Sequence, residues 1–400
     1  MREENFVGVI FGGDMNSYAV ARAFYEAYII KTIVIGRYPL YPTTSSKLIE
    51  GYYYEDLLKD EVMLKALEDV DKLYPNKKKI VLSNTDYYVK QVIHNKDKIE
   101  KLSDNFIVPT INEELFLQLF NKDTFYELCN KLNLCHPETV VYDFSKDKLE
   151  EFEIPFTYPI FMKPGNTDKY TRLDFAGRQK GYIINNREEF DKNINIIKKK
   201  NGGYDDKFIV QEYIESTDED MYVYTFYANK DHEVEVMSGG KILMHDRTPE
   251  LIGNYNAITN ACDEKLCYEL KDFVEKIKYT GIGHFDVVYD RLRDRYVVFE
   301  INIRQGRSNM YNLANGVNLM EYIVNDYIKN EKHEFKIANR DFTVSIVSKR
   351  QLKKHVPNHE IKNFYRFTLA PYDMNLKRLY YQYRWDQKIL KGYKKYNEKK

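Results

Sequence analysis

The chain has 400 residues, of which 43% are hydrophobic and 15% aromatic, and its 61 Lys and Arg balance its 61 Asp and Glu. This length and composition exclude a disordered chain and predict two or three folded domains. No apolar run approaches the roughly 18 residues of a membrane-spanning helix, and the first apolar run predicts a strand rather than a secretory signal, so we expect a cytoplasmic protein. The four cysteines lack zinc-site spacing and predict buried thiols.

The N-terminal segment predicts an open α/β sheet. Residues 6–11 (FVGVIF) form a short apolar strand, which runs into two glycines and then an alanine-rich helix. Residues 31–35 and 79–82 predict the second and third strands. Ligands of such sheets bind at the carboxyl ends of the strands, where Asn84 and Asp86 follow the third strand. A plain helix N-cap is the alternative for these two residues. The glycine turn lacks G-x-G-x-x-G spacing, which argues against a dinucleotide site.

The next part of the chain carries cations in unusual places. Residues 115–132 predict a helix, and residues 158–164 (YPIFMKP) predict a strand that contains Lys163. A lysine within a buried strand is unfavourable unless it has a partner. The polar, lysine- and arginine-rich segment 166–181 can fold over phosphates, and Lys180 is its best phosphate candidate.

The middle of the chain alternates helices with long strands. An amphipathic helix at 186–200 precedes a strand at 208–214, and residues 221–228 and 233–241 predict an antiparallel pair that ends in a bend. A helix at 261–278 follows. After residue 309 a further apolar helix closes this region.

The stretch from 279 to 309 carries the strongest chemical signal. Two apolar runs, 284–289 and 295–303, predict neighbouring strands joined by a charged turn. Asp286 lies in the first strand, and Glu300 and Asn302 share one face of the second because strand side chains alternate. Two carboxylates and an amide oxygen that converge make a site for Mg²⁺. For any one of these acids, a solvated position on a half-exposed hairpin is an equally good interpretation.

Several of these segments together resemble the ATP-grasp ligases. The pattern D-x-x-x-D followed by h-h-E-h-N-x-R (where h is hydrophobic) is similar to the last catalytic motif of that family, and P-x-h-x-K-P at 159–164 is similar to its lysine strand. The words G-G-D-x-N-x-Y and A-R-A-F-x-E-A-Y near the N-terminus resemble the bacterial carboxylate–amine ligase group that includes D-aspartate ligases of cell-wall synthesis. The resemblance covers roughly residues 7–328.

The resemblance implies an α/β (α+β) ATP-grasp fold in three parts. An N-terminal open parallel-sheet domain would occupy residues 1–115. The ATP-grasp domain, 116–333, would sandwich ATP between two α+β subdomains, with a lid subdomain at about 140–212. A basic aromatic extension would occupy 334–400.

The resemblance also implies roles for individual residues. ATP phosphates would be met by Lys122, Lys163 and Lys180, adenine by Glu212, Tyr213 and Ile214, and the ribose by Asp220. Two Mg²⁺ ions would be held by Asp286, Glu300 and Asn302. The donor carboxylate and the developing oxyanion would be held by Arg304 and Arg307, since an Arg fork binds carboxylate bidentately. His284 stands where some members of the family carry Arg. The remaining substrate contacts would be Gly13, Asp14, Asn16, Lys241 and Arg247.

The function implied is ATP-dependent joining of a carboxylate to an amine through an acyl phosphate. In the D-aspartate ligase group, the donor is a small amino acid and the acceptor is the lysine amine of a UDP-linked peptidoglycan peptide. A ligase that makes a small peptide or a modified metabolite is the alternative. A non-catalytic ATP-grasp protein that binds a precursor or a membrane is a second alternative.

The C-terminal segment is basic. Residues 347–400 contain 15 Lys and Arg and 4 Asp and Glu, a balance of +11 that leaves −11 for the other residues. Cations interleaved with Tyr and Trp385 suit contact with the anionic inner face of the membrane. The same residue types could bind nucleic acid, which is a weaker alternative, and we expect no dedicated nucleic-acid partner. A docked helix with a solvated basic face explains the same composition.

Overall fold

The computed structural model describes residues 4–165, 170, 173, 178–179, 181–200, 205–247, 254–306 and 310–397. Lys180 and Arg307, predicted to contact phosphate and the donor, lie outside these residues. The chain divides into two compact units. Unit 1 comprises Met1–Phe116, Asp218–Asp286 and Ile301–Lys400, and unit 2 comprises Leu117–Thr217 and Val287–Glu300. The three-part division expected from the sequence stays a prediction.

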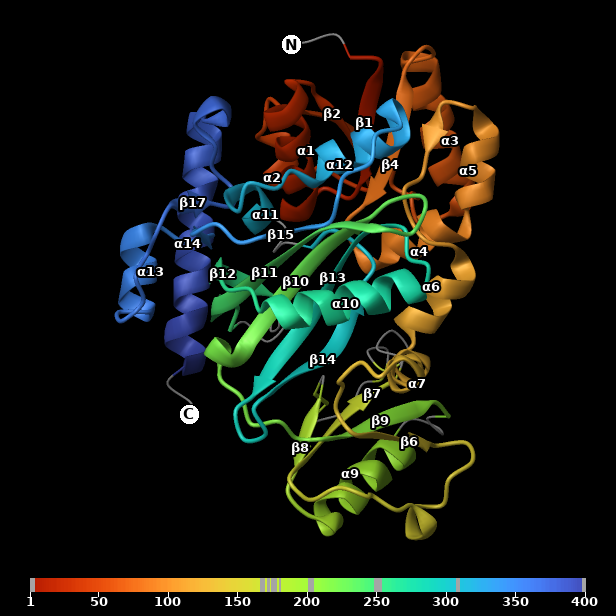
Figure 1. Ribbon diagram of the computed structural model, residues 1–400, viewed down its shortest axis with the longest axis vertical. Helices are drawn as coiled ribbons and strands as arrows, with labels where there is room; N and C mark the ends of the chain where they lie inside the picture. The colour runs from red at the N-terminus through yellow and green to blue at the C-terminus, as the bar shows by residue number, and fades with distance from the viewer. Residues whose placement is uncertain are drawn as a thin grey trace. The chain divides into compact units, whose positions relative to one another are not determined.

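The first part of unit 1 contains a parallel sheet with the strand order β3-β2-β1-β4-β5 (Figure 1). Its strands are β1 (Phe6–Phe11), β2 (Thr32–Gly36), β3 (Ile49–Tyr53), β4 (Lys78–Ser83) and β5 (Phe106–Ile107). Its helices are α1 (Met15–Tyr28), α2 (Tyr41–Thr44), α3 (Asp60–Leu73), α4 (Asp86–His94) and α5 (Lys96–Leu102), and α6 (Glu113–Phe120) contains the boundary between the two units. The chain leaves β1 first toward β2 and later returns to β4, so the strand order reverses between β1 and β4, where open sheets bind ligands.

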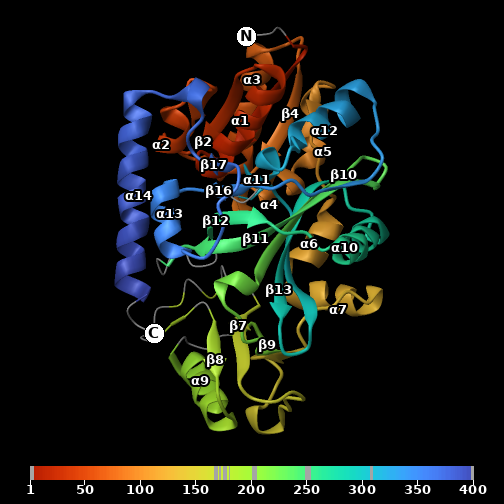
Figure 2. The same ribbon diagram turned by 60° about the vertical axis from the view of Figure 1, so that its left-hand side comes forward.

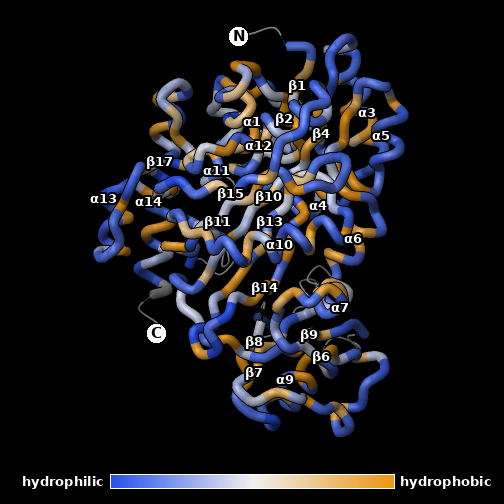
Figure 3. The backbone as a smooth tube through the Cα atoms, viewed as in Figure 1, coloured by the Kyte–Doolittle hydropathy of each residue, from blue (hydrophilic) through white to orange (hydrophobic). Residues whose placement is uncertain are grey.

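A second sheet has the order β14-β13-β10-β11-β12-β16-β17, and β15 pairs with β11. The strands are β10 (Met221–Ala228), β11 (Val234–His245), β12 (Tyr255–Asn260), β13 (Gly281–Asp290), β14 (Arg295–Asn302), β15 (Lys336–Ala338), β16 (Thr343–Ser345) and β17 (Phe364–Arg366). The helices of this region are α10 (Glu264–Lys276), α11 (Met310–Ala314) and α12 (Leu319–Val324). Figure 3 shows hydrophobic residues along β1 in the first sheet and hydrophilic ones along the peripheral helix α13 (Lys349–His355).

Unit 2 contains a four-stranded antiparallel sheet with the order β6-β9-β7-β8. Its strands are β6 (Thr139–Asp143), β7 (Ile160–Pro164), β8 (Tyr182–Ile184) and β9 (Lys207–Glu212), and its helices are α7 (Lys122–Leu132) and α9 (Arg187–Lys200). Tyr142, Phe190 and Phe208 are fully buried in its core. These aromatic rings pack α9 against the sheet.

Several elements differ from the sequence-based expectation, and three of them have a clear physical reason. The strand β3 was not predicted, because IEGYY carries a charge and a glycine and lacks apolar alternation. The predicted helix at 115–132 is two helices that meet at Asn121. The predicted bend at Gly239 is absent within the described residues, where β11 continues to His245. A Cβ at Gly239 would lie 2.4 Å from the Ala261 carbonyl oxygen, so this glycine admits a neighbouring backbone rather than a turn.

The C-terminal segment is an ordered part of unit 1. Helix α14 (Leu376–Asn397) runs along the outer side of this unit in both ribbon views (Figures 1 and 2). Ile389 and Tyr393 belong to the same hydrophobic cluster as residues of β11, β12 and β16. Within the described residues, no helix has both the length and the apolar character that a bilayer span requires.

Candidate active site

The turn after β1 holds the predicted substrate residues Gly13, Asp14 and Asn16. Asp14 is the N-cap of α1, and its Oδ1 accepts hydrogen bonds from the backbone N–H groups of Asn16 at 3.0 Å and Ser17 at 3.2 Å. The Asn16 side chain donates to the Asn84 carbonyl oxygen at 3.0 Å, which ties this turn to the end of β4. These contacts fix the turn at the point where the strand order reverses. Direct contact of the three residues with a substrate stays a prediction.

Asn84 is the best-placed donor at this edge. The helix-cap alternative is wrong for Asn84 and Asp86, because Thr85 occupies the cap position of α4. The Asn84 side chain is 1% exposed, and its Nδ2 finds no partner among the described residues. A buried amide without an acceptor is unusual in a native fold and marks this position as a candidate ligand contact.

His284 and Arg304 lie next to one another in unit 1. The Arg304 carbonyl oxygen is 3.1 Å from His284 Nδ1, so this nitrogen carries the proton. Burial and the neighbouring Arg304 charge lower the pKa of His284 to about 3. The imidazole is therefore neutral at physiological pH and does not supply the positive charge of an arginine. The Arg304 guanidinium forms an ion pair with Asp86.

Asp286 and Asn302, two of the predicted metal ligands, are in direct contact. Asn302 Nδ2 donates to Asp286 Oδ2 at 2.9 Å, and the Tyr255 hydroxyl donates to Asp286 Oδ1 at 2.5 Å. Each carboxylate oxygen therefore accepts a hydrogen bond that orients it. Within the described residues no group of three or more His, Cys, Asp and Glu side chains is placed to hold a metal. The predicted set differs from such groups, since one of its three members is an amide.

Tyr255 orients the Asp286 carboxylate, and its removal is expected to weaken the site. We expect Tyr255→Phe to raise the Mg²⁺ concentration needed for half-maximal activity by about 10-fold, because partners of metal ligands contribute 10–100-fold to metal affinity. A Mg²⁺ titration of ADP release measures this. Tyr268→Phe, which alters an exposed hydroxyl on α10, is the matched control and should leave the titration unchanged. Equal titrations for both variants would contradict the role of Tyr255.

A polar network connects the end of β11 to the C-terminal helix. His245 Nδ1 lies 3.2 Å from an Asp218 oxygen, and Arg247 Nη2 lies 2.6 Å from the other. Burial alone would raise the pKa of Asp218, but the hydrogen bond from His245 and the Arg247 charge lower it. The Tyr393 hydroxyl donates to the His245 carbonyl oxygen at 2.5 Å, and the Arg247 guanidinium lies 5.8 Å from the Tyr393 ring centroid. Helix α14 thus positions Arg247, a predicted substrate contact.

Two further predicted residues of unit 1 occupy ordinary structural positions. Lys241 lies within β11, opposite Tyr222 on one side and Thr259 on the other. Asp220 ends the short 3₁₀ helix Asp218–Asp220 and is 3% exposed. Their contacts with an acceptor and with ribose stay predictions.

In unit 2, Lys163 lies in a cluster that includes Tyr126 and Glu300. Its Nζ is 3.3 Å from the Tyr126 hydroxyl, which donates at 2.8 Å to the Phe299 carbonyl oxygen. Burial and the nearby Lys122 charge lower the pKa of Lys163 to about 7, and Glu300 opposes this shift. Two lysines and one carboxylate therefore act on one another, and an added polyanion would relieve the lysine repulsion.

Glu212, predicted to lie against adenine, is a buried structural anion. Its carboxylate lies 2.8 Å from Arg295 Nη2 and 3.0 Å from Arg293 Nη1, and it accepts the Glu138 backbone N–H at 3.1 Å. Strand β9 ends at Glu212, so Tyr213 and Ile214 begin the segment that leaves the sheet. The Glu212 side chain is part of this ion-pair network, and the contact of Glu212, Tyr213 and Ile214 with adenine stays a prediction.

A pocket of about 510 Å³ lies elsewhere in unit 2. Its lining includes Cys129, His136, Glu138 and Arg295 and contains none of the predicted lysines. Its lining residue His136 stacks on Tyr126 of the Lys163 cluster, with the two ring centroids 5.2 Å apart.

The chain is 36% identical over 336 residues to the D-aspartate ligase of Enterococcus faecium (strain Aus0004), which covers 83% of this chain and 79% of that relative. The chain belongs to the ATP-grasp carboxylate–amine ligases. No protein-family model matches it. The expected family and its ATP-dependent ligase activity are confirmed by this relationship.

Solved structures confirm the ATP-grasp fold of this ligase. An L-amino acid ligase from Bacillus licheniformis matches with a TM-score of 0.55 and 13% identity, over 81% of this chain and 75% of that one. The biotin carboxylase domain of the Hydrogenobacter thermophilus 2-oxoglutarate carboxylase, in complex with MgADP, ADP and bicarbonate, matches with a TM-score of 0.59 and 15% identity, over 85% and 73%.

Two residues of this ATP-grasp ligase were missed from the sequence, and a third was noticed without a defined role. Tyr255 and Tyr126 contact Asp286 and Lys163 from elements far away in sequence, so no local pattern could reveal them. Asn84 was noticed, and its position directly after a strand was the only signal. Each of the three side chains presents a polar group to a predicted site residue or to the edge where ligands of such sheets bind.

Proposed function

We propose that this ligase activates the carboxylate of a small amino acid, D-aspartate or a close analogue, and transfers it to an amine. The acceptor is the lysine side-chain amine of a UDP-MurNAc-peptide cell-wall precursor. The name of the Enterococcus faecium relative supports the donor, and the relative spans most of this chain. The protein would act in the cytoplasm, where such a nucleotide-linked precursor is found.

The reaction proceeds in two balanced steps. A donor carboxylate oxygen attacks the γ-phosphorus of ATP, and ADP leaves with the electron pair of the broken P–O bond. The acceptor amine then attacks the carbonyl carbon of the acyl phosphate, loses a proton, and phosphate leaves. The protein contributes by positioning both reactants and by offsetting negative charge.

The predicted site residues fit this chemistry. Lys163 and Lys122 supply positive charge to the phosphates, and Arg304 with Arg307 would hold the donor carboxylate. Asp286, Glu300 and Asn302 would hold two Mg²⁺ ions, which supply charge neutralisation at the phosphates when bound. The MgADP complex of the carboxylase domain supports this assignment by analogy of fold. The neutral His284, whose Nδ1 proton faces the Arg304 carbonyl oxygen, would accept a hydrogen bond at Nε2 rather than offset charge.

One observation carries the proposal. The Asp286 carboxylate and the Asn302 amide are hydrogen-bonded on neighbouring strands, and Glu300 precedes Asn302 by two residues on the same strand. A strand period of two places Glu300 and Asn302 on one face. Oxygen ligands held in this way are what a hard cation requires.

A screen of donors and acceptors tests the proposal. We expect ADP release only when ATP, D-aspartate and a lysine-containing nucleotide-linked peptide are all present. L-aspartate and D-glutamate are the matched control donors. Mass spectrometry should show the acceptor heavier by one aspartyl residue. Turnover with free amino acids as acceptors and none with the nucleotide-linked peptide would instead support a ligase for small peptides or metabolites.

The proposal also includes a location. The basic C-terminal segment would bring the ligase to the anionic inner face of the membrane, near the enzymes that consume the precursor. The supporting observation is the cationic outer side of α14, on which Lys377, Arg384 and Lys388 are exposed.

A further inference from the structure

Helix α14 has one buried side that fixes it to unit 1. Arg378, Gln382, Asp386, Ile389 and Tyr393 are buried, and they recur at the spacing of one helix face. The Arg378 guanidinium lies 3.7 Å from the Tyr18 ring centroid and donates to the Thr368 and Pro42 carbonyl oxygens at 2.9 and 3.1 Å. The helix is therefore pre-formed and held in place, so a partner that binds it need not order it.

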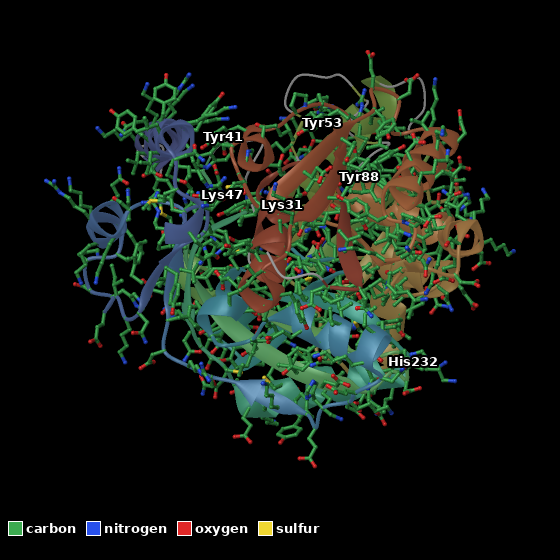
Figure 4. All side chains as sticks on the ribbon, turned by 90° about the horizontal axis from the view of Figure 1, so that it is seen from above. Lys31, Tyr41, Lys47, Tyr53, Tyr88 and His232 are labelled. Carbon is green, nitrogen blue, oxygen red and sulfur yellow. The ribbon has the colours of Figure 1, made fainter. Side chains whose placement is uncertain are left out.

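The opposite side of α14 exposes apolar and aromatic side chains near its N-terminal end. Leu376 is 86% exposed, and other exposed large side chains here are Leu379, Tyr380 and Tyr383, together with Met374 just before the helix. Figure 4 looks along this helix and shows side chains projecting from its outer side, with the labelled Tyr41 next to it. Apolar groups gathered on one exposed helix side mark an interaction surface.

The same side is cationic along its length. Lys377, Arg384, Lys388, Lys391 and Lys394 are exposed on α14. Helix α13 contributes four more exposed cations, Lys349, Arg350, Lys353 and Lys354, and His355 of that helix contacts Tyr393 with a ring-centroid distance of 4.8 Å. These cations line one side of unit 1.

The acids of this segment turn inward. Asp386 is buried and pairs with Arg366 at 3.1 Å, and Asp373 is buried between Ser46 and Arg378. Among described residues 347–397, Glu360 is the one acid classed as exposed, and it lies 3.9 Å from Lys362. The exposed surface of the segment therefore carries a strong positive excess.

We propose that the outer side of α14 binds an anionic lipid bilayer. The helix, of 22 residues and about 33 Å in length, would lie in the plane of the interface. Leu376, Leu379 and Tyr383 would enter the headgroup and acyl boundary, and the lysines would contact the lipid phosphates. This inference does not depend on the ligase reaction, since it rests on the surface of α14 alone.

A lipid surface explains more of this side than a nucleic acid does. Nucleic-acid binding uses cations and stacking rings, and it has no need for exposed leucines. Leu376 and Leu379 have no ring on which a base could stack. Transfer of such apolar side chains out of water is favourable. An apolar strip flanked by lysines is the pattern of helices that lie on membranes.

Flotation of the full-length protein with lipid vesicles tests the inference, without ATP or substrates. We expect binding to vesicles that contain phosphatidylglycerol and none to pure phosphatidylcholine. Binding should fall steeply between about 0.1 and about 1 M salt, over which the screening length shrinks from about 10 to about 3 Å. Lys391→Glu with Lys394→Glu should weaken binding by about 30-fold or more, since each lysine near an anionic surface contributes about 5-fold. Leu376→Ser with Tyr383→Ser should weaken it by about 10-fold.

Matched variants separate this surface from charge in general. Lys131→Glu with Lys192→Glu replaces two exposed lysines of unit 2 and changes the net charge by the same amount as the α14 pair. This variant should leave flotation unchanged. All variants should keep ADP release in solution within about 2-fold, as expected for surface substitutions, which shows that they fold. Absence of flotation with anionic vesicles would overturn the inference. Tighter binding to single-stranded DNA, lost in the same α14 variants, would overturn it in favour of a nucleic acid.

Discussion

Replacing Asp286 by Asn is expected to reduce amine-dependent ADP release by about 10³-fold or more, because the variant removes a charged ligand from the proposed metal site. The substitution is nearly isosteric, and its remaining oxygen can still accept the Tyr255 hydroxyl, now 2.5 Å from Asp286. The fold should therefore survive. The measurement is steady-state ADP release with saturating Mg²⁺, together with thermal unfolding.

A control and a second variant make this test decisive. Asp272→Asn changes an exposed carboxylate on α10 and should keep full activity. Glu300→Gln should reproduce the loss seen for Asp286→Asn, since both acids are proposed to hold the same cations. Undiminished turnover in either Asp286→Asn or Glu300→Gln would remove the metal assignment.

Replacing Lys163 by Met is expected to lower ATP turnover strongly while it stabilises the protein. Burial first, and then the Lys122 charge, lower the pKa of Lys163 to about 7. The folded protein therefore disfavours the charged form of Lys163 until bound phosphates stabilise it. Turnover should fall by about 10²-fold or more, because the lost charge acts on the transferring phosphoryl group. Near pH 7 the unfolding free energy should rise, on the order of 2 kcal/mol.

The pH dependence of this gain has a definite sign. The unfolded chain holds the Lys163 proton up to about pH 10.4, whereas the folded chain releases it near pH 7. Between these values the unfolded state binds more protons, so the parent protein gains stability as pH rises. The advantage of Lys163→Met should therefore be largest at or below pH 7 and should shrink toward pH 10.

Chemical denaturation at several pH values measures this difference, with Lys148→Met as the exposed control. ATP binding offers an independent readout, since the phosphates should restore the proton of Lys163. Calorimetry of ATP binding near pH 8 in buffers with different ionisation enthalpies should show proton uptake by the parent and less by Lys163→Met. A pH-independent difference in stability would contradict the lowered pKa.

Much of the fold was predictable because short segments of the sequence show the hydrophobic pattern of the element that they form. The apolar run at Phe6–Phe11 and the two runs around the charged turn at 291–294 match β1, β13 and β14 closely. Each combines an uninterrupted apolar or alternating sequence with glycines or charges at its ends. The strand β3 shows the opposite case, since its residues form a strand only because they pair with β2.

The site was predictable in its residue types and less so in its contacts. Asp14 was predicted to contact substrate, yet its carboxylate caps α1, a role that the D-M-N-S sequence also permits. Arg378 is one of the 15 Lys and Arg of the basic C-terminal segment, yet it is 2% exposed. Its burial depends on Tyr18 and Asp373, so no pattern within α14 could reveal it.

The anchoring of Arg378 has a consequence for biosynthesis. Its partners Pro42 and Ser45 belong to the segment that leaves the ribosome early, more than three hundred residues before their guanidinium partner. The nascent N-terminal sheet can pair its strands soon after they emerge, but the surface around Tyr18 stays uncovered until translation is almost finished. Chaperones that recognise uncovered aromatic surface would therefore bind the growing chain until α14 docks.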